Sequence, residues 1–363
     1  MSLASNPAQM QSPAPRRRDD YRLIGGAAER AAAARLVNAQ WYKCPVPRPV
    51  MKGLMQRDDA HALRDTALWY ALIIGSGALF AYGWTAGWGA VALFAAYFVY
   101  ATLYCGPADS RWHESSHGTA FKTRWINDVL YQCASFQVLR RPTRWRWSHA
   151  RHHTDTLVTG RDPEIAAPVP VDWASTLLNL FAILNGPKEM VAVLRNACGS
   201  ISAEEKTFVP EMEWPRMVRE ARLWVLVYAV VMGSALALQS WLPVLLIGLL
   251  PGMLGAWLYN FFGLTQHAGM PENVLDHRLN CRTVYMNPLF RFLYWNMNYH
   301  VEHHMFPMVP YHQLPRLHEA IQADCPPPYA STIAAYAEIL PTMWRQAKDP
   351  YHCVRRTLPA QAA

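Results

Sequence analysis

Residues Thr66 to Ala108 read TALWYALIIGSGALFAYGWTAGWGAVALFAAYFVYATLYCGPA and contain no Asp, Glu, Lys or Arg. A second stretch without these residues covers Leu223 to Pro271. As a helix, the first stretch would measure about 65 Å, roughly twice the hydrocarbon core of a membrane. Each stretch therefore predicts two membrane spans that fold back on each other.

Turn-forming residues divide each stretch near its middle. Residues 83–88 (GWTAGW) interrupt the first stretch and residues 239–243 (QSWLP) interrupt the second. We therefore expect four transmembrane helices, at about residues 66–84, 88–107, 223–239 and 243–263. A further apolar patch, residues 171–184, is too short to span a membrane and contains Asp172, which predicts an interfacial or re-entrant helix.

The composition and charge agree with a membrane protein. Hydrophobic residues make up 52% of the chain and charged residues 17%, against about 25% charged residues in an average globular protein. The formal net charge is +8, and the positive residues lie outside the two uncharged stretches and their turns. The positive-inside rule then predicts that both termini and the segments carrying the active site are cytoplasmic. Without a zinc-finger or other nucleic-acid-binding signature, we expect no nucleic-acid partner. The alternative to four membrane spans is two buried helical hairpins in a soluble protein.

The sequence also predicts how the chain is divided. We expect a cytosolic tail and interfacial segment over residues 1–64, a membrane domain over residues 65–320 and a cytosolic tail over residues 321–363. Within the membrane domain, residues 109–222 and 264–320 would form a helical cap. Seven cysteines without a C-x-x-C motif predict reduced thiols. The polar N-terminal stretch Arg16–Asp20 argues against a secretory signal.

Histidines are clustered in three boxes. His113 and His117 are four residues apart, and an H-x-x-H-H pattern occurs twice, at residues 149–153 and 300–304. His267 stands alone at the end of the fourth expected span. Residues three or four apart share a helix face, so these imidazoles can converge on a metal. A zinc ion is usually four-coordinate, so this number of histidines predicts two metal ions, whose identity the ligand type does not decide.

Box one also matches the H-E-x-x-H motif of zinc proteases, with Glu114 as the general base. A membrane zinc protease is therefore an alternative function. It leaves most of the other clustered histidines without a role, and we favour a pair of iron atoms for that reason. A metal-binding membrane receptor without catalytic activity is a further alternative.

The three boxes resemble those of the membrane fatty acid desaturase superfamily, which includes acyl desaturases, hydroxylases and ketolases. Box three continues as His304-Met305-Phe306-Pro307, and Pro310-Tyr311-His312-Gln313-Leu314-Pro315 follows. The resemblance covers about residues 65–320. It implies an all-α integral membrane fold of four transmembrane helices with a cytosolic helical cap that holds two non-haem iron atoms. It further implies O2-dependent oxidation of an unactivated C–H bond. We expect an acyl desaturase first and a hydroxylase or monooxygenase of the same fold second.

The resemblance also implies the site residues and the partners. The implied metal ligands are His113, His117, His149, His152, His153, His267, His300, His303 and His304. Gly263 occupies a position at which many members carry Asn. Electrons are expected from a separate ferredoxin, rubredoxin or cytochrome with its reductase. Arg140, Arg141 and Arg144 are a predicted docking surface for such an acidic partner.

Further site residues follow from general chemistry. Carboxylates commonly orient metal-binding imidazoles, and the predicted ones are Asp128, Asp155, Asp162 and Glu302. The substrate is expected to be a fatty acyl chain or another small molecule from the bilayer or the cytosol. The aromatic residues predicted to line its path are Trp112, Trp147, Trp295 and Tyr299.

Overall fold

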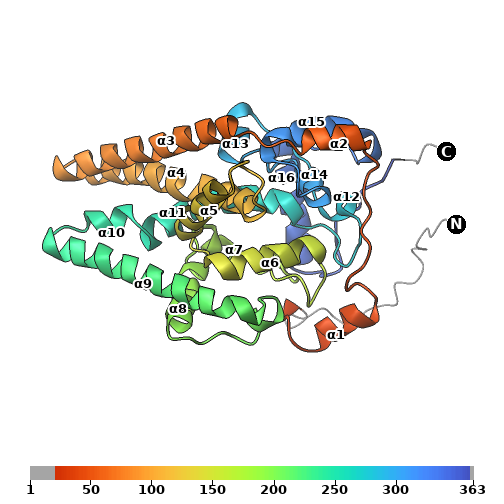
Figure 1. The fold of residues 1–363 in the computed structure, drawn as a ribbon, viewed down its shortest axis with the longest axis horizontal. Coiled ribbons are helices and arrows are strands. Elements are labelled where there is room, and N and C mark those ends of the chain that lie inside the picture. Colours follow the sequence, from red (N-terminus) through yellow and green to blue (C-terminus); the bar gives the residue numbers. More distant parts are fainter. Residues whose placement is uncertain (1–20, 360–363) are drawn as a thin grey trace.

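A computed structural model describes residues 21–359 of the protein, which leaves Arg16–Asp20 outside the described residues. Within the described range the structure is helical, and its only β-bridges are isolated ones at Thr283–Tyr299 and Val284–Tyr329. Long helices extend to one end of the molecule, and shorter helices gather at the other end (Figure 1). This arrangement confirms the predicted all-helical fold.

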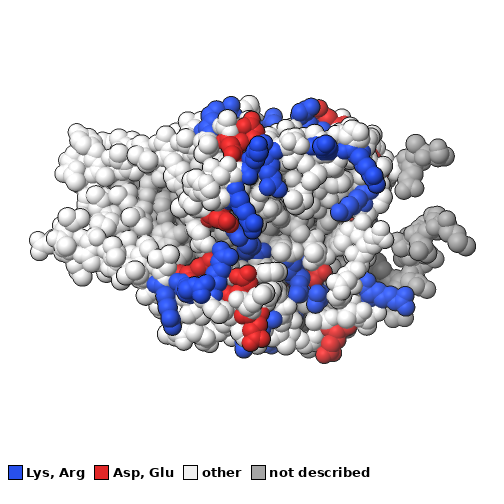
Figure 2. Space-filling model, viewed as in Figure 1, with Lys and Arg blue, Asp and Glu red and all other residues white. Residues whose placement is uncertain are grey.

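Four helical segments are long and apolar enough to cross a membrane, as predicted from the uncharged stretches. They contain α3 (Asp59–Thr85), α4 (Ala90–Ser116), α9 (Trp214–Ala237) and the pair α10 (Leu242–Leu246) and α11 (Leu249–His267). On the face shown in Figure 2, the end of the molecule formed by these helices carries no charged side chain. Ile74 is 68% exposed there, Val91 85% and Leu236 71%. Outward-facing apolar side chains on every span indicate a membrane protein.

The helices differ from the predicted spans at their ends. Helix α4 continues through Ser116, and α9 begins at Trp214, because the polar segments beside the uncharged stretches are also helical. The fourth span is interrupted at Gly248, whose φ is 90° and where a Cβ atom would lie 2.5 Å from the ring of Tyr228. Only glycine adopts this conformation without strain in such a close contact.

A hydrogen bond beside a proline in α4 connects this helix to α3. Pro107 has no N–H, so the carbonyl of Leu103 lacks its helical partner. The indole Nε1 of Trp69 on α3 donates a hydrogen bond to this carbonyl at 2.8 Å. The two helices are thereby fixed to each other just before α4 enters the cap.

Helices α4 and α11 pack closely at a glycine. A Cβ atom at Gly255 would lie 1.9 Å from the carbonyl oxygen of Ala101, so no larger residue fits. This contact brings the end of α11, with His267, close to the end of α4, with His113. The spans thus position histidines from two distant parts of the sequence.

The cap consists of short helices around these two helix ends. They are α5 (Arg124–Gln137), α6 (Pro142–Thr154), α7 (Trp173–Leu180), α8 (Asn185–Ala197), α12 (His277–Asn280), α13 (Pro288–Leu293), α14 (His300–Met305) and α15 (Leu314–Ile321). Helices α7 and α8 are bent by 75° and together have the composition of a broken span or re-entrant loop, in the region of the predicted patch 171–184.

The segments expected to be tails also contain helices. Helices α1 (Gly26–Ala33) and α2 (Arg48–Leu54) precede α3, and α16 (Thr332–Gln346) lies near the C-terminal end. Helix α16 packs against α11, where the hydroxyl of Tyr336 donates a hydrogen bond to the carbonyl of Phe261 at 2.5 Å. Residues 332–346 are therefore part of the folded structure.

Candidate metal centre

Four helices present the nine histidines to a common interior region. His113 and His117 lie at the end of α4, and box two lies on α6, which begins at Pro142 and ends at Thr154. Box three forms α14, and His267 is the last residue of α11. The hydroxyl of Tyr131 on α5 donates to the carbonyl of Pro142 at 2.7 Å and so fixes the start of α6.

The nine histidines form two separate groups. The first histidine group comprises His113, His117, His149, His153 and His303. The second histidine group comprises His152, His267, His300 and His304. In each group the possible ligand atoms all lie within 4.8 Å of one another. Both groups are built from distant parts of the chain, and together they contain each of the nine predicted ligands.

Each H-x-x-H-H box is divided between the two groups in the same way. In box two, His149 and His153 belong to the first histidine group and His152 belongs to the second. In box three, the pair four residues apart belongs to the second group and His303 to the first. Helical geometry explains this division. Residues i and i+4 lie on the same face of a helix, whereas residue i+3 projects to one side of that face. Two boxes of this pattern facing each other therefore place their imidazoles in two adjacent groups.

The separations between Nε2 atoms fit metal ligands at right angles. In the first group these separations are 2.8 Å for His113–His303, 3.1 Å for His117–His149 and 3.1 Å for His149–His153. Two donors at right angles, each about 2.1 Å from a metal, lie about 3.0 Å apart, whereas donors of a tetrahedral site lie about 3.4 Å apart. The five imidazoles thus converge closely enough to serve as ligands of one metal ion.

The second group has the same short separations. The Nε2 atoms of His267 and His300 are 2.9 Å apart, and those of His300 and His304 are 3.0 Å apart. Burial and the neighbouring imidazoles lower the pKa of His300 and His304 well below the ordinary value, and the same holds for His303. A neutral imidazole has a free lone pair, which is the form that binds a metal.

Several of the imidazoles are oriented through their other ring nitrogen. Nδ1 of His152 lies 2.8 Å from Oδ2 of Asp162, and Nδ1 of His149 lies 3.1 Å from Oε2 of Glu164. Nδ1 of His267 lies 2.9 Å from the carbonyl oxygen of Asn280. Such partners fix the tautomer in which Nε2 is free for a metal.

Of the four predicted orienting carboxylates, only Asp162 lies against a boxed imidazole among the described residues. Asp155 instead pairs with Arg161 at 3.1 Å, and Asp128 pairs with Arg146 at 3.2 Å. Glu302 accepts from Nδ1 of His318 at 2.5 Å and from the hydroxyl of Thr283 at 2.6 Å. These carboxylates are close to the boxes in sequence, but their side chains point to other helices or to the surface.

Glu164 was missed by the sequence analysis. It lies two residues after Asp162, in the loop that follows box two, and this closeness to a predicted carboxylate is the signal that could have identified it. Burial raises its pKa, but the charge and hydrogen bond of His149 outweigh this effect and lower the pKa to about 2. The carboxylate of Glu164 is therefore ionised and able to hold the N–H of His149.

Glu114 does not face the histidines, although it lies between two of them in sequence. Its Oε1 accepts the backbone N–H of Tyr311 at 3.1 Å, and the whole side chain is buried. The general base of a zinc protease has to reach a metal-bound water, and Glu114 points in another direction. This geometry argues against the protease alternative.

A third group of possible ligands adjoins the second. It consists of His277, Cys281 and His304, the last of which it shares with the second histidine group. The thiol of Cys281 donates to Oδ1 of Asn280 at 3.2 Å, and burial raises the pKa of this thiol well above its ordinary value. Because His304 is already a member of the second histidine group, we do not assign a third metal to this group.

A cavity of about 610 Å³ reaches both histidine groups. Its wall includes His113 and His149 of the first group and His152 and His267 of the second. Gly263 also lines it, and a Cβ atom at this position would meet nothing within 4 Å. Open space therefore lies beside Gly263, one helical turn before His267 in the wall of the cavity.

Only one of the four predicted substrate-lining aromatics lines this cavity. Trp112 does, together with Trp145. Trp295 instead stacks on Tyr311 with ring centroids 4.1 Å apart, and Tyr299 packs beside His318. Trp147 packs against a separate apolar cluster around Phe208, Val209 and Met217. The three residues are part of the packing of the cap, because their rings face neighbouring helices.

The three arginines predicted to form a docking surface point inward. Arg140 pairs with Asp109 in the cavity wall, under the ring of Trp112. Arg141 is buried and bonded to Glu189 at 2.9 Å and to Glu205. Arg144 is only partly exposed and lies over Trp145. Arg140 and Arg141 are therefore ion-paired with carboxylates inside the cap, and neither is part of an exposed basic surface.

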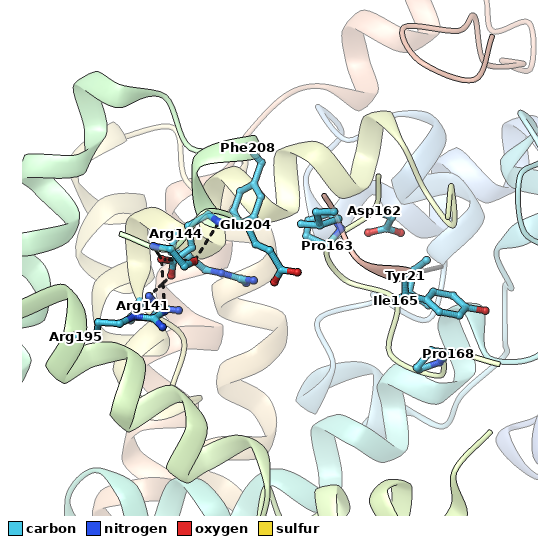
Figure 3. Close-up of a pocket in the computed structure, with 13 residues that line it drawn as sticks. Tyr21, Arg141, Arg144, Asp162, Pro163, Ile165, Pro168, Arg195, Glu204 and Phe208 are labelled. Carbon is cyan, nitrogen blue, oxygen red and sulfur yellow. Dashed lines mark hydrogen bonds and ion pairs between the residues drawn. The ribbon is translucent and has the colours of Figure 1, made fainter. Parts of the chain in front are cut away.

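Arg141 and Arg144 line a second, smaller cavity of about 280 Å³. Figure 3 shows these arginines and Glu204 on one side of it, and Asp162, Ile165 and Pro168 on the other. The loop of residues 162–168 separates this cavity from the larger one. No histidine of either group lines it.

The fold and site define a helical protein with two all-histidine groups, each able to hold a metal ion, at the ends of apolar helices. Residues 96–336 match the family model described as Fatty acid desaturase, and the chain belongs to this family. The match covers more than half of the chain and includes all three boxes and His267. No curated protein sequence matches this chain.

Proposed function

We propose that this protein is an O2-dependent membrane oxidoreductase that holds two iron atoms, one in each histidine group. The observation that carries the proposal is the division of nine imidazoles into two adjacent groups whose Nε2 atoms converge. Family membership supports the same reaction type. When bound, a pair of iron atoms would activate O2 for the removal of a hydrogen atom from an unactivated C–H bond.

The residues around the histidines would position the substrate and the ligands. Asp162 and Glu164 hold the imidazoles of His152 and His149 in place. The cavity beside Gly263 would bring a C–H bond next to both groups. Trp112 and Trp145 would provide apolar surface, and the Arg140–Asp109 pair would provide a polar contact in the same wall.

We propose desaturation of an acyl chain as the reaction. It removes two hydrogen atoms from adjacent carbons, consumes one O2, two electrons and two protons, and releases two molecules of water. Hydroxylation by the same site is the second candidate, in which one oxygen atom enters the substrate and one leaves as water. The open space at Gly263 favours neither, since it enlarges the cavity without selecting a carbon.

Mass spectrometry of lipids and small metabolites tests this proposal. Cells that contain the protein should accumulate a product that lacks two hydrogen atoms relative to its precursor. A product with one additional oxygen atom would instead show a hydroxylase. No change of either kind, in cells where the protein is present with its iron, would contradict an oxidative function.

The substitution Glu114→Gln separates this proposal from a zinc protease. In a protease of the H-E-x-x-H type it removes the general base and abolishes activity. Here Glu114 bonds to the backbone of Tyr311, and glutamine keeps an oxygen that can accept the same N–H. The variant should keep its iron and its oxidation product.

We further propose that the four spans place the cap, both described chain ends and the metal sites on the cytoplasmic side. The distribution of Lys and Arg supports this orientation. Reaction of single engineered cysteines at positions 219 and 87 with a membrane-impermeant reagent tests it. In intact cells, the reagent should label position 87 only.

A further inference from the structure

An aromatic stack connects the surface of the cap to the second histidine group. The indole of Trp41 stacks on the imidazole of His277, with ring centroids 4.2 Å apart and planes only 7° from parallel. Trp41 is partly exposed, whereas His277 is 3% exposed. The two rings thus run from solvent into the interior.

The stack continues to a proposed metal ligand. The ring centroid of His277 lies 5.1 Å from that of His304, and ring nitrogens of the two residues lie within 4.8 Å of each other. His304 belongs to the second histidine group. Electron tunnelling falls off steeply with distance, so closely spaced π systems are a favourable route between the surface and a buried redox centre.

The position of Trp41 is fixed by contacts on both sides. Its Nε1 donates to the carbonyl of Thr154 at the end of α6, at 2.9 Å. The next residue, Tyr42, donates its backbone N–H to the carbonyl of Leu275 at 3.1 Å, and its ring lies 3.6 Å from the guanidinium of Arg278. The stack is therefore held between box two and the segment that carries His277.

The chain around Trp41 carries positive charge only. Residues 35–57 contain five Lys or Arg and no Asp or Glu: Arg35, Lys43, Arg48, Lys52 and Arg57. All of these except Arg57 are exposed. The nearby carboxylates, Asp276 and Asp324, both pair with Arg278. In Figure 1 this segment, with α2, runs along the end of the molecule opposite the tips of the long helices.

We propose that residues 35–57 form the docking surface of an acidic one-electron carrier protein, and that Trp41 and His277 conduct its electrons to the second histidine group. This inference rests on the proposed function, because O2-dependent oxidation requires two electrons from outside the substrate. Each reduced carrier molecule would supply one electron, so two carrier molecules would be oxidised per turnover. The surface is accessible from the side of the cap, where a water-soluble carrier would approach.

Binding is tested on metal-free protein, independently of turnover. The probes are a plant-type ferredoxin, a rubredoxin and a soluble cytochrome b domain, each with an acidic surface. At low salt at least one should bind, and reversing Lys43, Arg48 and Lys52 to Glu should weaken this binding by about tenfold or more. The control is Arg219→Glu on α9, which is exposed outside this surface and should leave binding unchanged. Absence of binding by all three carriers, or equal binding by the reversed variant, would overturn the docking surface.

The conducting role is tested by anaerobic reduction of iron-loaded protein at saturating carrier. Trp41→Leu should slow this reduction severalfold at unchanged carrier affinity and iron content, and Trp41→Phe, which keeps an aromatic ring, should slow it less. A purely structural Trp41 would instead lower the thermal unfolding temperature or the iron content, with the reduction rate per bound iron unchanged. That result would overturn the inference. Protein that binds no iron, or that dithionite cannot reduce, would overturn the proposed function itself.

Discussion

The imidazole of His153 stacks on that of His304, with ring centroids 4.2 Å apart and an interplanar angle of 19°. The first ring belongs to the first histidine group and the second ring to the second group. The two groups therefore share a wall made of one histidine from box two and one from box three. Metals held by the two groups would be neighbours, which is the arrangement that a dinuclear reaction needs.

The separation into two groups predicts the effect of removing one ligand. His300→Ala takes away a donor of the second histidine group only, so iron content should fall from about two atoms per chain to about one. Turnover should be lost, since both metals are required. The control is His352→Ala, which lies outside both groups. Iron analysis and product assays check the result, and full iron with full turnover in His300→Ala would contradict the ligand assignment.

The carboxylates behind the ligands predict a graded effect. Glu164→Gln removes the charge that holds the N–H of His149, and loss of such a partner typically costs about 10–100-fold in metal affinity or activity. Asp128→Asn is the matched control, because Asp128 pairs with Arg146 and its side chain is 50% exposed. Metal titration and turnover should separate the two variants. Equal behaviour would show that Glu164 does not orient a ligand.

The helical fold class and the clustering of the histidines can be predicted from the sequence, for physical reasons. Long uncharged stretches have few alternatives to membrane spans, and i, i+4 spacing of histidines has few alternatives to a shared helix face. The sequence does not predict which group each histidine joins. That depends on how α6 and α14 face each other, which is a tertiary property.

The surroundings of the site were harder to predict. Asp155 is nearer to box two in sequence than Asp162, but only Asp162 points at an imidazole, and Asp155 pairs with Arg161. Trp295 looked like a residue of the substrate path, and in the fold it stacks on Tyr311. Packing decides the direction in which a side chain points within the cap, and packing produces no periodic pattern in the sequence.

The cavity predicts a substitution that blocks substrate without harming the fold. A side chain at Gly263 would enter open space beside His267, so Gly263→Leu should reduce turnover strongly. Gly263→Ala should be tolerated and slightly more stable, by about 0.5–1 kcal/mol, because alanine favours a helix over glycine. Thermal unfolding and product formation check both variants. Undiminished turnover in Gly263→Leu would show that the substrate takes another path.

The ion pair between Arg141 and Glu205 predicts a pH dependence of stability. Burial raises the pKa of Glu205, but Arg141 outweighs this effect and the pKa is lowered from its ordinary value of 4.5. A carboxylate with a lowered folded-state pKa stabilises the fold above its unfolded pKa, and this contribution is lost as the pH falls through the folded value. Stability should therefore decline as the pH falls below 4.5, and less steeply in Glu205→Gln. Chemical unfolding at several pH values measures the two slopes, and equal slopes would exclude this pair as a cause.

The metal content of the purified protein tests the central claim most directly. Protein expressed in medium that contains both iron and zinc should be analysed by elemental mass spectrometry, with protein concentration from amino-acid analysis. The two histidine groups predict about two metal ions per chain, and the proposed function predicts that these are iron, with little zinc. A single zinc ion per chain, or protein without bound metal, would contradict the account.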